Sequence, residues 1–516
     1  MSESRRIACR ICLPGPSGGG VVCDPVSSED LLKLAIIGPL FLGVAPLAGV
    51  AMKNRPGAQR WVFAAMCFMT INGFLAAGNW GLTLGSIENY RGHTKGYHFY
   101  FNHALALALI AARLAEDGFR IGFLPPGMGW LFGTFGAMRG RRRTVNPRIF
   151  RLAPPGLLAY LVYCAVSLLS IVNAPQPNLT LMAAHKMLFA SVLMVASYNV
   201  LRTEADLQFF LKVMVVTLTW QLFVVLKMKY LEGMYQVRGT FEHQNPLAMY
   251  CILIGMVFLA TALGPPFPGS NWVLWGFLVT GVIVQSTLSR AALAMFAAGT
   301  MGILGLSLLE KPTARRLGVT GFLGIAGVLG LLLSLDTIIA RFNDHGNAAS
   351  GELREVMNRA CRQMAQDRTL GIGWNNYALV VNPPYPYADV YYEWIRGRGM
   401  KVDETKANAV VESHYYLLLG ETGKPALVLY LVLIAGGLWR NLQAVLYFPH
   451  SFLRCLALGI GTGCSLNYVQ SLLERVLVQP RNLMLWMILF GISARLDVLR
   501  LAGVRPGNAE LERRNR

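Results

Sequence analysis

The residues best suited to chemistry lie in one polar interval, residues 341–423, of a chain that is otherwise mostly apolar. His414 stands near its end, and Glu421 follows seven residues later, which is two helical turns and therefore the same helix face. An imidazole titrates near neutral pH and can take a proton from a hydroxyl group. A glutamate inside an apolar helix is costly unless it is paired. We therefore predict that His414 and Glu421 are catalytic and that Glu412 supports them; the alternative is a purely structural histidine.

Two arginines stand three residues apart in a segment with the pattern of an amphipathic helix. Residues 352–367 contain no Gly or Pro, and their apolar side chains recur at helical spacing. Arg359 and Arg362 then project from the polar face as neighbours. A guanidinium group pairs with phosphate oxygens through two hydrogen bonds. We predict an anion clamp at these two arginines; the alternative is an ordinary solvated face.

Two more arginines precede apolar spans. Arg238 lies shortly before Pro246, and Asn245 with Pro246 is typical of a helix start in which the asparagine is the cap. The free N–H groups of a helix N-terminus attract anions, so Arg238 is a candidate phosphate ligand with Asn245 in support. Ser289 and Arg290 open another span. Either arginine could instead extend to the lipid headgroups without binding a ligand.

Lys186 lies inside an apolar span, next to a histidine. Ionisable groups within such spans usually face the interior of the helix bundle. Lys186 therefore contacts a substrate or pairs with a buried carboxylate, such as Glu421 or Asp336, and the sequence leaves both interpretations open. We assign it a supporting role.

No set of side chains has the spacing of a metal site. His93, His98 and His103 recur every five residues, which places them on different helical faces. The chain contains no D-x-D motif, and its nine cysteines form no paired framework beyond a single C-x-x-C near the start. We expect neither a metal ion nor another cofactor.

Composition indicates the class of fold. The 516 residues are 54% hydrophobic and only 14% charged, whereas soluble domains carry about a quarter charged residues. Backbone polar groups in lipid must be satisfied within each segment, so the long apolar stretches predict an all-α, polytopic membrane bundle. The expected spans are residues 31–52, 61–85, 98–115, 155–173, 178–200, 206–229, 246–264, 271–288, 290–309, 316–338, 413–439, 451–473 and 480–499.

Lysines and arginines orient these spans. The net charge is +20, from 47 basic and 27 acidic residues, and the basic side chains are scattered through short loops. This distribution is typical of cytoplasmic loops and differs from the basic stripe of a nucleic-acid-binding domain, so we expect no nucleic-acid partner. The long loop 339–412, with short helices of its own, is then placed on the outer face.

Thirteen spans would put the two termini on opposite faces. We favour about twelve crossings with both termini cytoplasmic, which requires that 31–52 is a hairpin or surface element, or that 98–115 is too short to cross. The expected divisions are a flexible cytoplasmic tail at 1–30, transmembrane helices at 31–338, the outer loop at 339–412, transmembrane helices at 413–499 and a basic cytoplasmic tail at 500–516.

These segments, in this order, resemble the O-antigen ligase / O-antigen polymerase superfamily of bacterial envelope glycan transferases. The resemblance covers roughly residues 155–500. It is carried by Arg238-Gly-Thr-Phe-Glu-His-Gln-Asn245 before a span, Thr287-Leu-Ser-Arg290 at the next outer turn, Arg359 and Arg362 ahead of Gly371-Ile-Gly373, and His414 followed by Glu421-Thr-Gly423. Gln244 departs from the family pattern, which has proline before the asparagine. The stretch Asn89-Tyr-Arg-Gly-His-Thr-Lys-Gly96 resembles members found in exopolysaccharide gene contexts.

The resemblance implies transfer of a glycan from undecaprenyl diphosphate to an acceptor hydroxyl on the periplasmic face of the bacterial inner membrane, in lipopolysaccharide or exopolysaccharide biosynthesis. The acceptor would be lipid A–core, another lipid-linked repeat or a protein. By resemblance, Arg238, Arg290, Arg359 and Arg362 hold the diphosphate and His414 activates the acceptor.

Other functions stay open. A protein O-oligosaccharyltransferase differs only in its acceptor. A polysaccharide or lipid transporter would show paired repeats and helices broken at mid-membrane, and neither pattern is visible in the sequence. A non-enzymatic membrane scaffold is a third class. The aromatic residues between 382 and 394 either stack on sugars or pack the outer loop.

Overall fold

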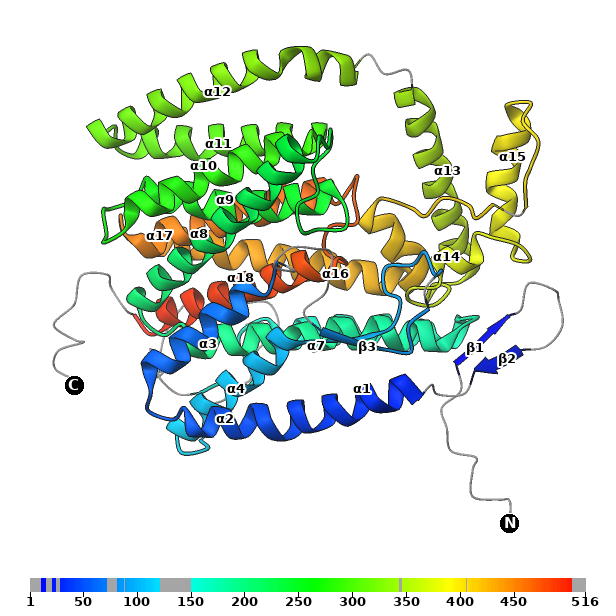
Figure 1. The fold of residues 1–516 in the computed structure, drawn as a ribbon, viewed down its shortest axis with the longest axis horizontal. Coiled ribbons are helices and arrows are strands. Elements are labelled where there is room, and N and C mark those ends of the chain that lie inside the picture. Colours follow the sequence, from blue (N-terminus) through cyan, green and yellow to red (C-terminus); the bar gives the residue numbers. More distant parts are fainter. Residues whose placement is uncertain are drawn as a thin grey trace, which may run out of the picture.

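The computed structural model describes residues 11–14, 21–24, 28–71, 81–87, 89–120, 150–342, 346–404 and 406–503. The chain forms a bundle of helices that run side by side, with a smaller cluster of helices at one end (Figure 1). Almost all of the described secondary structure is helical, as composition predicts.

The helices are α1 (Ser28–Pro39), α2 (Ala45–Ala51), α3 (Pro56–Phe68), α4 (Phe101–Glu116), α6 (Leu157–Leu168), α7 (Pro177–Val200), α8 (Glu204–Leu226), α9 (Gln244–Ala262), α10 (Ser270–Thr287), α11 (Arg290–Glu310), α12 (Ala314–Phe342), α13 (Gly346–Asp367), α14 (Tyr377–Val380), α15 (Asp389–Gly397), α16 (His414–Tyr447), α17 (Phe452–Gln470) and α18 (Pro480–Leu501). Short π-helical or 3₁₀ turns lie at Leu40–Val44, Leu169–Asn173, Lys227–Leu231 and Pro386–Ala388. Two antiparallel hairpins pair β1 (Ile11–Pro14) with β2 (Val21–Asp24) and β3 (Gly81–Leu84) with β4 (Tyr97–Tyr100).

Seven segments of the described chain are each long and apolar enough to cross a membrane. They are Ser28–Ala51, Pro177–Val200, Glu204–Leu231, Gln244–Ala262, Arg290–Glu310, His414–Tyr447 and Pro480–Leu501. The chain is therefore a multi-pass membrane protein with an all-α bundle. The total of about twelve crossings stays a prediction.

The first apolar segment is continuous although it contains two prolines. Helices α1 and α2 form one rod of 24 residues, Ser28–Ala51. Pro39 has no N–H to donate, and the π-helical turn Leu40–Val44 that follows it accommodates the irregularity. Pro46 falls in the first turn of α2, where no partner for its N–H is needed. A hairpin at 31–52 is therefore not what forms.

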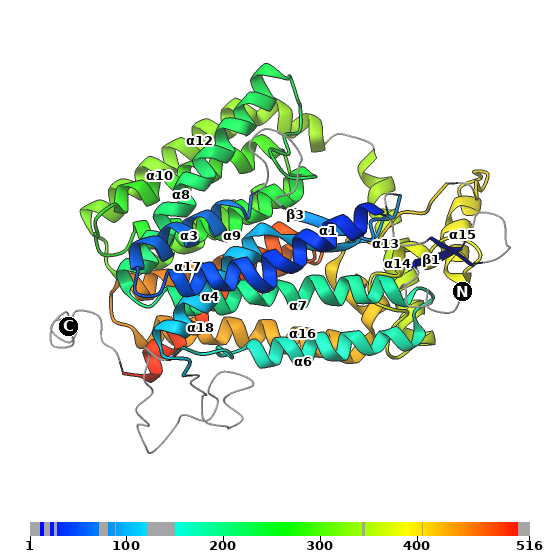
Figure 2. The same ribbon diagram turned by 60° about the horizontal axis from the view of Figure 1, so that its bottom comes forward.

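The two ends of the bundle carry different groups. We call the end with α13, α14 and α15 the loop end, and the opposite end the basic end (Figures 1 and 2). The start of α1 lies at the loop end, where Asp30 accepts a hydrogen bond from the amide of Gly85 (3.3 Å). Helix α18 finishes at the basic end, where Arg495 donates to the carbonyl of Arg202 between α7 and α8 (3.1 Å).

The described chain thus begins and ends at opposite ends of the bundle, unlike the expected arrangement with both termini on one face. The reason is that Ser28–Ala51 runs the full length of the bundle. The expected tail at 1–30 lies partly outside the described residues, and its described part includes the β1–β2 hairpin.

The helix that forms within the expected span 61–85 is shorter than the apolar composition of this range suggests. Helix α3 ends at Phe68, and β3 occupies the last part of that range. Residues 97–100 are aromatic or histidine, which favours an extended strand, and Thr83 bonds across the hairpin to His98 Nδ1 (2.9 Å). Residues 72–80 lie outside the described chain.

Helices α9 and α18 form the centre of the bundle. All residues of α9 from Pro246 to Ala262 are buried, as expected for a helix that is apolar on every side. Helix α17 approaches α9 closely at Gly459 and Gly463. A Cβ atom on either glycine would stand 2.5 Å from the α9 backbone, so no larger residue fits there. Such a small-x-x-x-small pair is a common device of membrane helices.

The predicted helix 352–367 forms the larger part of α13. Helices α13, α14 and α15 share a small apolar core at the loop end. Tyr387, Tyr391 and Tyr392 are buried in that core, so these aromatic residues pack the outer loop. Tyr385 and Trp394 lie against it and are only partly buried.

Candidate functional site

Helix α16 is broken at Gly423, where φ is 77° and ψ is 179°. In an unbroken helix His414 and Tyr430 would be about 24 Å apart, at 1.5 Å per residue. Their ring centroids instead lie 5.1 Å apart. The two pieces of α16 therefore fold back on each other. The first piece, residues 414–422, is a short helix at the loop end and not the start of a straight crossing.

The break in α16 is held by a backbone contact with the two-glycine motif that precedes α14. The amide of Gly373 donates to the carbonyl of Glu421 (3.0 Å). A Cβ atom on Gly371 would overlap that same carbonyl, and one on Gly423 would overlap the carbonyl of Thr369. The motifs Gly371-Ile-Gly373 and Glu421-Thr-Gly423 are thus the two sides of one close contact.

Replacing Gly371 with alanine is expected to destabilise the protein by about 2–4 kcal/mol, because the residue has φ +77° and no room for a Cβ atom. Thermal unfolding of the purified protein in detergent would measure the loss. Gly351→Ala is the matched control, since Gly351 lies in α13 with open space around it. Equal midpoints for the two variants would contradict the proposed contact.

The carboxylate of Glu421 is buried within a chain of polar contacts. It accepts hydrogen bonds from the amide of Tyr377 (3.1 Å) and from His93 Nε2 (3.2 Å). Lys186 Nζ donates to His93 Nδ1 (2.9 Å), to the His93 carbonyl (2.9 Å) and to the carbonyl of Val478 (2.8 Å). Five separate segments of the chain thus meet at one lysine–histidine–glutamate relay.

The partners of His93 define its protonation state. An ammonium group only donates, so Nδ1 of His93 must accept and Nε2 must carry the proton that is donated to Glu421. Burial, reinforced by the charge of Lys186, holds the pKa of His93 well below its ordinary value. A neutral imidazole therefore joins a buried cation to a buried carboxylate. Lys186 pairs with Glu421 through this histidine, which realises one of the two interpretations that the sequence left open.

Residues 89–96, the stretch that resembles members found in exopolysaccharide gene contexts, lie over the loop between α13 and α14. The side chain of Asn375 donates to the carbonyl of Thr94 (2.9 Å) and accepts from its amide (3.3 Å). The hydroxyl of Tyr90 donates to the carbonyl of Asn375. This segment, 280 or so residues away in the chain, places His93 beside Glu421.

Replacing Lys186 with methionine is expected to destabilise the protein by about 3–5 kcal/mol, because it leaves Glu421 buried without its cation. The double variant Lys186→Met with Glu421→Gln should recover part of that loss, since no charge is then left unpaired. Unfolding midpoints in detergent would measure both. If the double variant is less stable by the full sum of the two single losses, the two residues are not coupled.

His414 is 1% exposed. Its amide donates to the carbonyl of Ser471 (2.9 Å), which fixes the start of α16 against the end of α17. Neither ring nitrogen makes a hydrogen bond to another described residue, and Nδ1 is fully buried. The ring stands against the side chain of Tyr430. His414 is therefore a buried imidazole whose proton-transfer capacity is not occupied within the described chain.

Arg475, in the loop between α17 and α18, is the arginine that the sequence interpretation missed. Burial lowers its pKa, whereas the nearby carboxylates of Glu421, Glu412 and Glu474 raise it. Its charge also acts on His414. Arg475 makes no hydrogen bond or ion pair with another described residue. A partly buried guanidinium group thus stands in the same electrostatic neighbourhood as the histidine with its donors uncommitted.

Glu474 links the loop between α17 and α18 to α9 and α13. Asn245 Nδ2 donates to Glu474 Oε1 (2.6 Å), and Arg354 lies 3.9 Å from the same carboxylate while it binds Glu412 (2.6 Å). The expectation that Asn245 caps α9 is wrong, because the helix begins at Gln244, two residues earlier than expected, and His243 is its cap. Asn245 and Glu412, both predicted as supporting residues, are joined through this network.

The carboxyl of Glu474 titrates near neutral pH. Burial, together with the neighbouring charge of Glu412, raises its pKa from the ordinary 4.5 to about 7. Between these two values the folded protein binds more protons than the unfolded chain, so stability falls as the pH rises through this window. Glu474→Gln keeps an acceptor for Asn245 and should remove this contribution. Unfolding midpoints measured from pH 4.5 to 8 should fall less steeply for Glu474→Gln than for the wild type, and parallel curves would contradict the assignment.

The two arginines of the predicted clamp have different surroundings. Arg362 donates to Glu355 and to the hydroxyl of Tyr416 (3.2 Å), so it ties α13 to α16. Arg359 is exposed, without a partner among the described residues, on the side of α13 that faces away from its buried core. The side of α13 that faces α16 carries Arg354 and Arg362.

The predicted residues of the earlier turns lie together at the loop end. The amide of Val237 meets the carbonyl of Ser286 (3.5 Å), which brings the loop before α9 beside the end of α10. Arg238 and Arg290 are both exposed there. Ser289 is buried and is the N-terminal flanking residue of α11, with no side-chain cap bond.

The structure therefore gathers the predicted residues at one end of the bundle but not in one contact set. His414, Glu421 and Lys186 share the interior with Arg475 and His93. Arg238, Arg290 and Arg359 stay on the exterior of the same end. Arg475 had one sequence signal, because it is a basic residue on a turn that is predicted to lie on the outer face, where such residues are disfavoured.

No group of three or more His, Cys, Asp or Glu side chains with metal-binding geometry occurs among the described residues. Comparison of the chain with protein-family models and with the curated proteins gives no match.

Proposed function

We propose that the protein is an O-antigen ligase/polymerase-like glycosyltransferase, which moves a glycan from undecaprenyl diphosphate to an acceptor hydroxyl at the loop end. The observation that carries the proposal is the pair formed by His414 and Arg475. The charge of Arg475 acts on His414, and neither side chain has a hydrogen-bond partner among the described residues. A base and an anion-binding group are the two functions that this transfer needs.

Arg475 would bind the diphosphate of the donor. A guanidinium group pairs with phosphate oxygens through two hydrogen bonds and stays charged in a partly buried site. As the bond between the anomeric carbon and the diphosphate oxygen breaks, negative charge grows on the leaving diphosphate. Arg475 stabilises that charge more strongly in the transition state than in the ground state.

His414 would accept the proton of the acceptor hydroxyl as its oxygen attacks the anomeric carbon. The displacement occurs in one step and inverts the configuration at that carbon. Because His414 is 1% exposed, the acceptor reaches it only after a local opening at the loop end. The relay of Lys186, His93 and Glu421 supports both groups, because Lys186 holds the loop of Arg475 and Glu421 lies two turns from His414.

The exposed arginines have a different place in this proposal. Arg238, Arg290 and Arg359 would attract the anionic headgroup of the donor to the loop end, and Arg362 would fix α13 against α16. Arginines on one surface raise the local concentration of an anionic ligand without a fixed geometry. The loop end would then be periplasmic and the membrane the bacterial inner membrane.

Purified protein in detergent, given an undecaprenyl-diphosphate-linked oligosaccharide, should release undecaprenyl diphosphate only when an acceptor is present. Acceptor-independent release, or none with any hydroxyl acceptor, would contradict the proposal. The glycans of a deletion strain would identify the acceptor. Single-repeat glycans indicate a polymerase, accumulated lipid-linked polymer a ligase, and unmodified protein a protein O-oligosaccharyltransferase.

A further inference from the structure

A cavity at the basic end lies far from the candidate site and serves no part of the proposed transfer. Its volume is about 120 Å³. It is formed by α9, α11, α16 and α17 with the start of α12, and its lining residues are Ala260, Leu263, Ile303, Leu306, Ser307, Glu310, Arg316, Val445, Arg454, Cys455 and Leu458.

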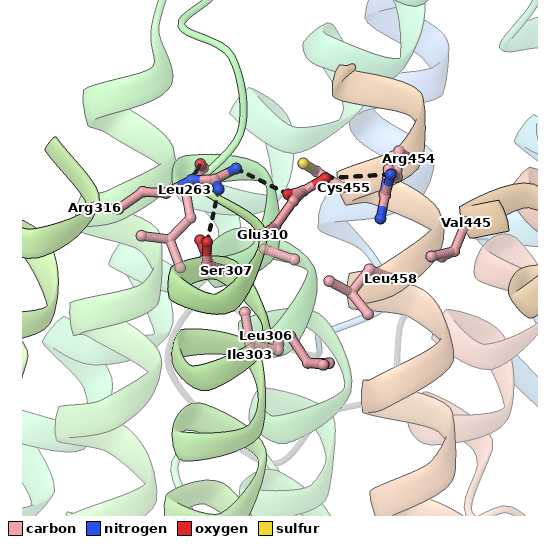
Figure 3. A pocket seen from close by; sticks show the side chains of 11 residues that line it. Leu263, Ile303, Leu306, Ser307, Glu310, Arg316, Val445, Arg454, Cys455 and Leu458 are labelled. Carbon is pink, nitrogen blue, oxygen red and sulfur yellow. Dashed lines mark hydrogen bonds and ion pairs between the residues drawn. The ribbon is translucent and has the colours of Figure 1, made fainter. Parts of the chain in front are cut away.

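The cavity has a charged end and an apolar end. Figure 3 shows Arg316, Glu310 and Arg454 together at one end, with Ile303 and Leu306 at the other. Arg316 is 3% exposed and is fully engaged. It donates to the carbonyls of Leu263, Ser307 and Lys311 at 2.7–3.1 Å, and to Glu310 (3.2 Å).

Arg454 retains donors for a ligand. Its Nη1 lies 3.2 Å from Glu310, and its other guanidinium nitrogens make no hydrogen bond with a described residue. Lys311, which directly follows Glu310, is exposed, and its ammonium group makes no hydrogen bond or ion pair with a described residue. Two cationic side chains of the lining, Arg316 and Arg454, thus face the single carboxylate of Glu310, and Lys311 adds a positive charge at the next position of the chain. The excess of positive charge favours an anion at this end.

Exposed apolar side chains lie beside the apolar end. Leu306 is 53% exposed, and on α16 beside the cavity Leu442 and Leu446 are 46% and 74% exposed. Such surfaces on the outside of a membrane bundle face lipid. Between the two ends, Ser307 is 8% exposed, and its hydroxyl makes no hydrogen bond with a described residue. A buried hydroxyl of this kind needs an acceptor.

We propose that this cavity binds one anionic phospholipid from the leaflet at the basic end. One acyl chain enters the apolar end beside Ile303 and Leu306. The hydroxyl of Ser307 donates to an ester carbonyl, and the phosphate is held by Arg454 and Lys311. The order of the contacts, apolar, then hydroxyl, then cationic, matches the order of groups along a phospholipid.

Native mass spectrometry of the purified protein with added lipid would test this site. Phosphatidylglycerol should bind more tightly than phosphatidylcholine with the same acyl chains. Lys311→Gln and Arg454→Gln should each weaken phosphatidylglycerol binding about fivefold, as expected for one cation near an anionic headgroup. Ala260→Leu, which fills the cavity, should abolish tight binding of both lipids. Lys212→Gln, a charge-matched change at an exposed position of α8, should have no effect.

Three outcomes would overturn the proposal. Equal binding of the two lipids by the wild type removes the headgroup preference. Loss of binding in Ala260→Leu without any effect of Lys311→Gln or Arg454→Gln indicates an apolar ligand. Equal weakening by Lys212→Gln indicates attraction to the basic surface as a whole. The side chain of Lys311 makes no hydrogen bond or ion pair within the described chain, so Lys311→Gln should fold even if Arg454→Gln does not.

Discussion

Replacement of His414 with glutamine is expected to lower the rate of glycan transfer by about 10²–10⁴-fold, the usual contribution of a general base. The amide side chain fills nearly the same space but takes up no proton, and the backbone bond to Ser471 is unaffected. The measurement is release of undecaprenyl diphosphate from a lipid-linked oligosaccharide under single-turnover conditions. Binding of the donor should be almost unchanged, because glutamine removes the base and not the anion site.

His450→Gln is the matched control for this variant, because His450 lies at the basic end and contacts Arg316 and Glu310. It should transfer glycan at the wild-type rate. Wild-type transfer by His414→Gln, in detergent with equal amounts of folded protein, would end the assignment of His414 as the base. A lower rate together with an equally lower thermal stability would indicate a structural role.

Replacement of Arg475 with lysine is expected to lower kcat/KM for the donor by about 10²–10³-fold, the cost of losing one preorganised hydrogen-bond donor to the developing charge. Lysine keeps the positive charge, but a single ammonium group cannot pair with a phosphate through two parallel hydrogen bonds. The measurement is the transfer rate against donor concentration. Both kcat and donor affinity should fall, because the diphosphate is present in the ground state and in the transition state.

Arg359→Lys distinguishes the site that the sequence predicts from the site that the geometry favours. If the diphosphate lies on the exposed face of α13, Arg359→Lys should lower kcat/KM for the donor by about 10²–10³-fold. Arg475→Lys should then be active. Arg396→Lys, at an exposed position of α15 outside both sites, controls for the loss of guanidinium groups at the loop end. Full activity of Arg475→Lys would refute the role proposed for Arg475.

Helices were predicted correctly from the sequence where a single physical rule determines them. The segment without Gly or Pro at 352–367 became α13, because helical periodicity and the absence of helix breakers do not depend on distant contacts. The apolar length of the spans predicted the membrane bundle for the same reason. The break of α16 at Gly423 could not be predicted in this way, since it exists through a contact with Gly371, 52 residues earlier.

The buried part of the candidate site is formed by side-chain contacts between distant segments, and the spacing of residues in the sequence does not predict such contacts. His93, His98 and His103 were considered as one periodic set, yet they lie in a loop, a strand and a helix. Only the tertiary contact with Lys186 gives His93 its role. The exposure of Arg359 and the engagement of Arg362 by Glu355 likewise depend on how α13 packs against its neighbours.

The contact between Lys186 and the carbonyl of Val478 has a consequence for biosynthesis. The chain is made from its N-terminus, so Lys186 enters the membrane long before residue 478 is translated. Until the last hairpin, α17 and α18, has been inserted, this ammonium group lacks one of its three acceptors and Arg475 is absent. If Arg475 holds the diphosphate as proposed, the nascent protein cannot bind a donor lipid before this hairpin is inserted, and no transfer can begin on a half-made chain.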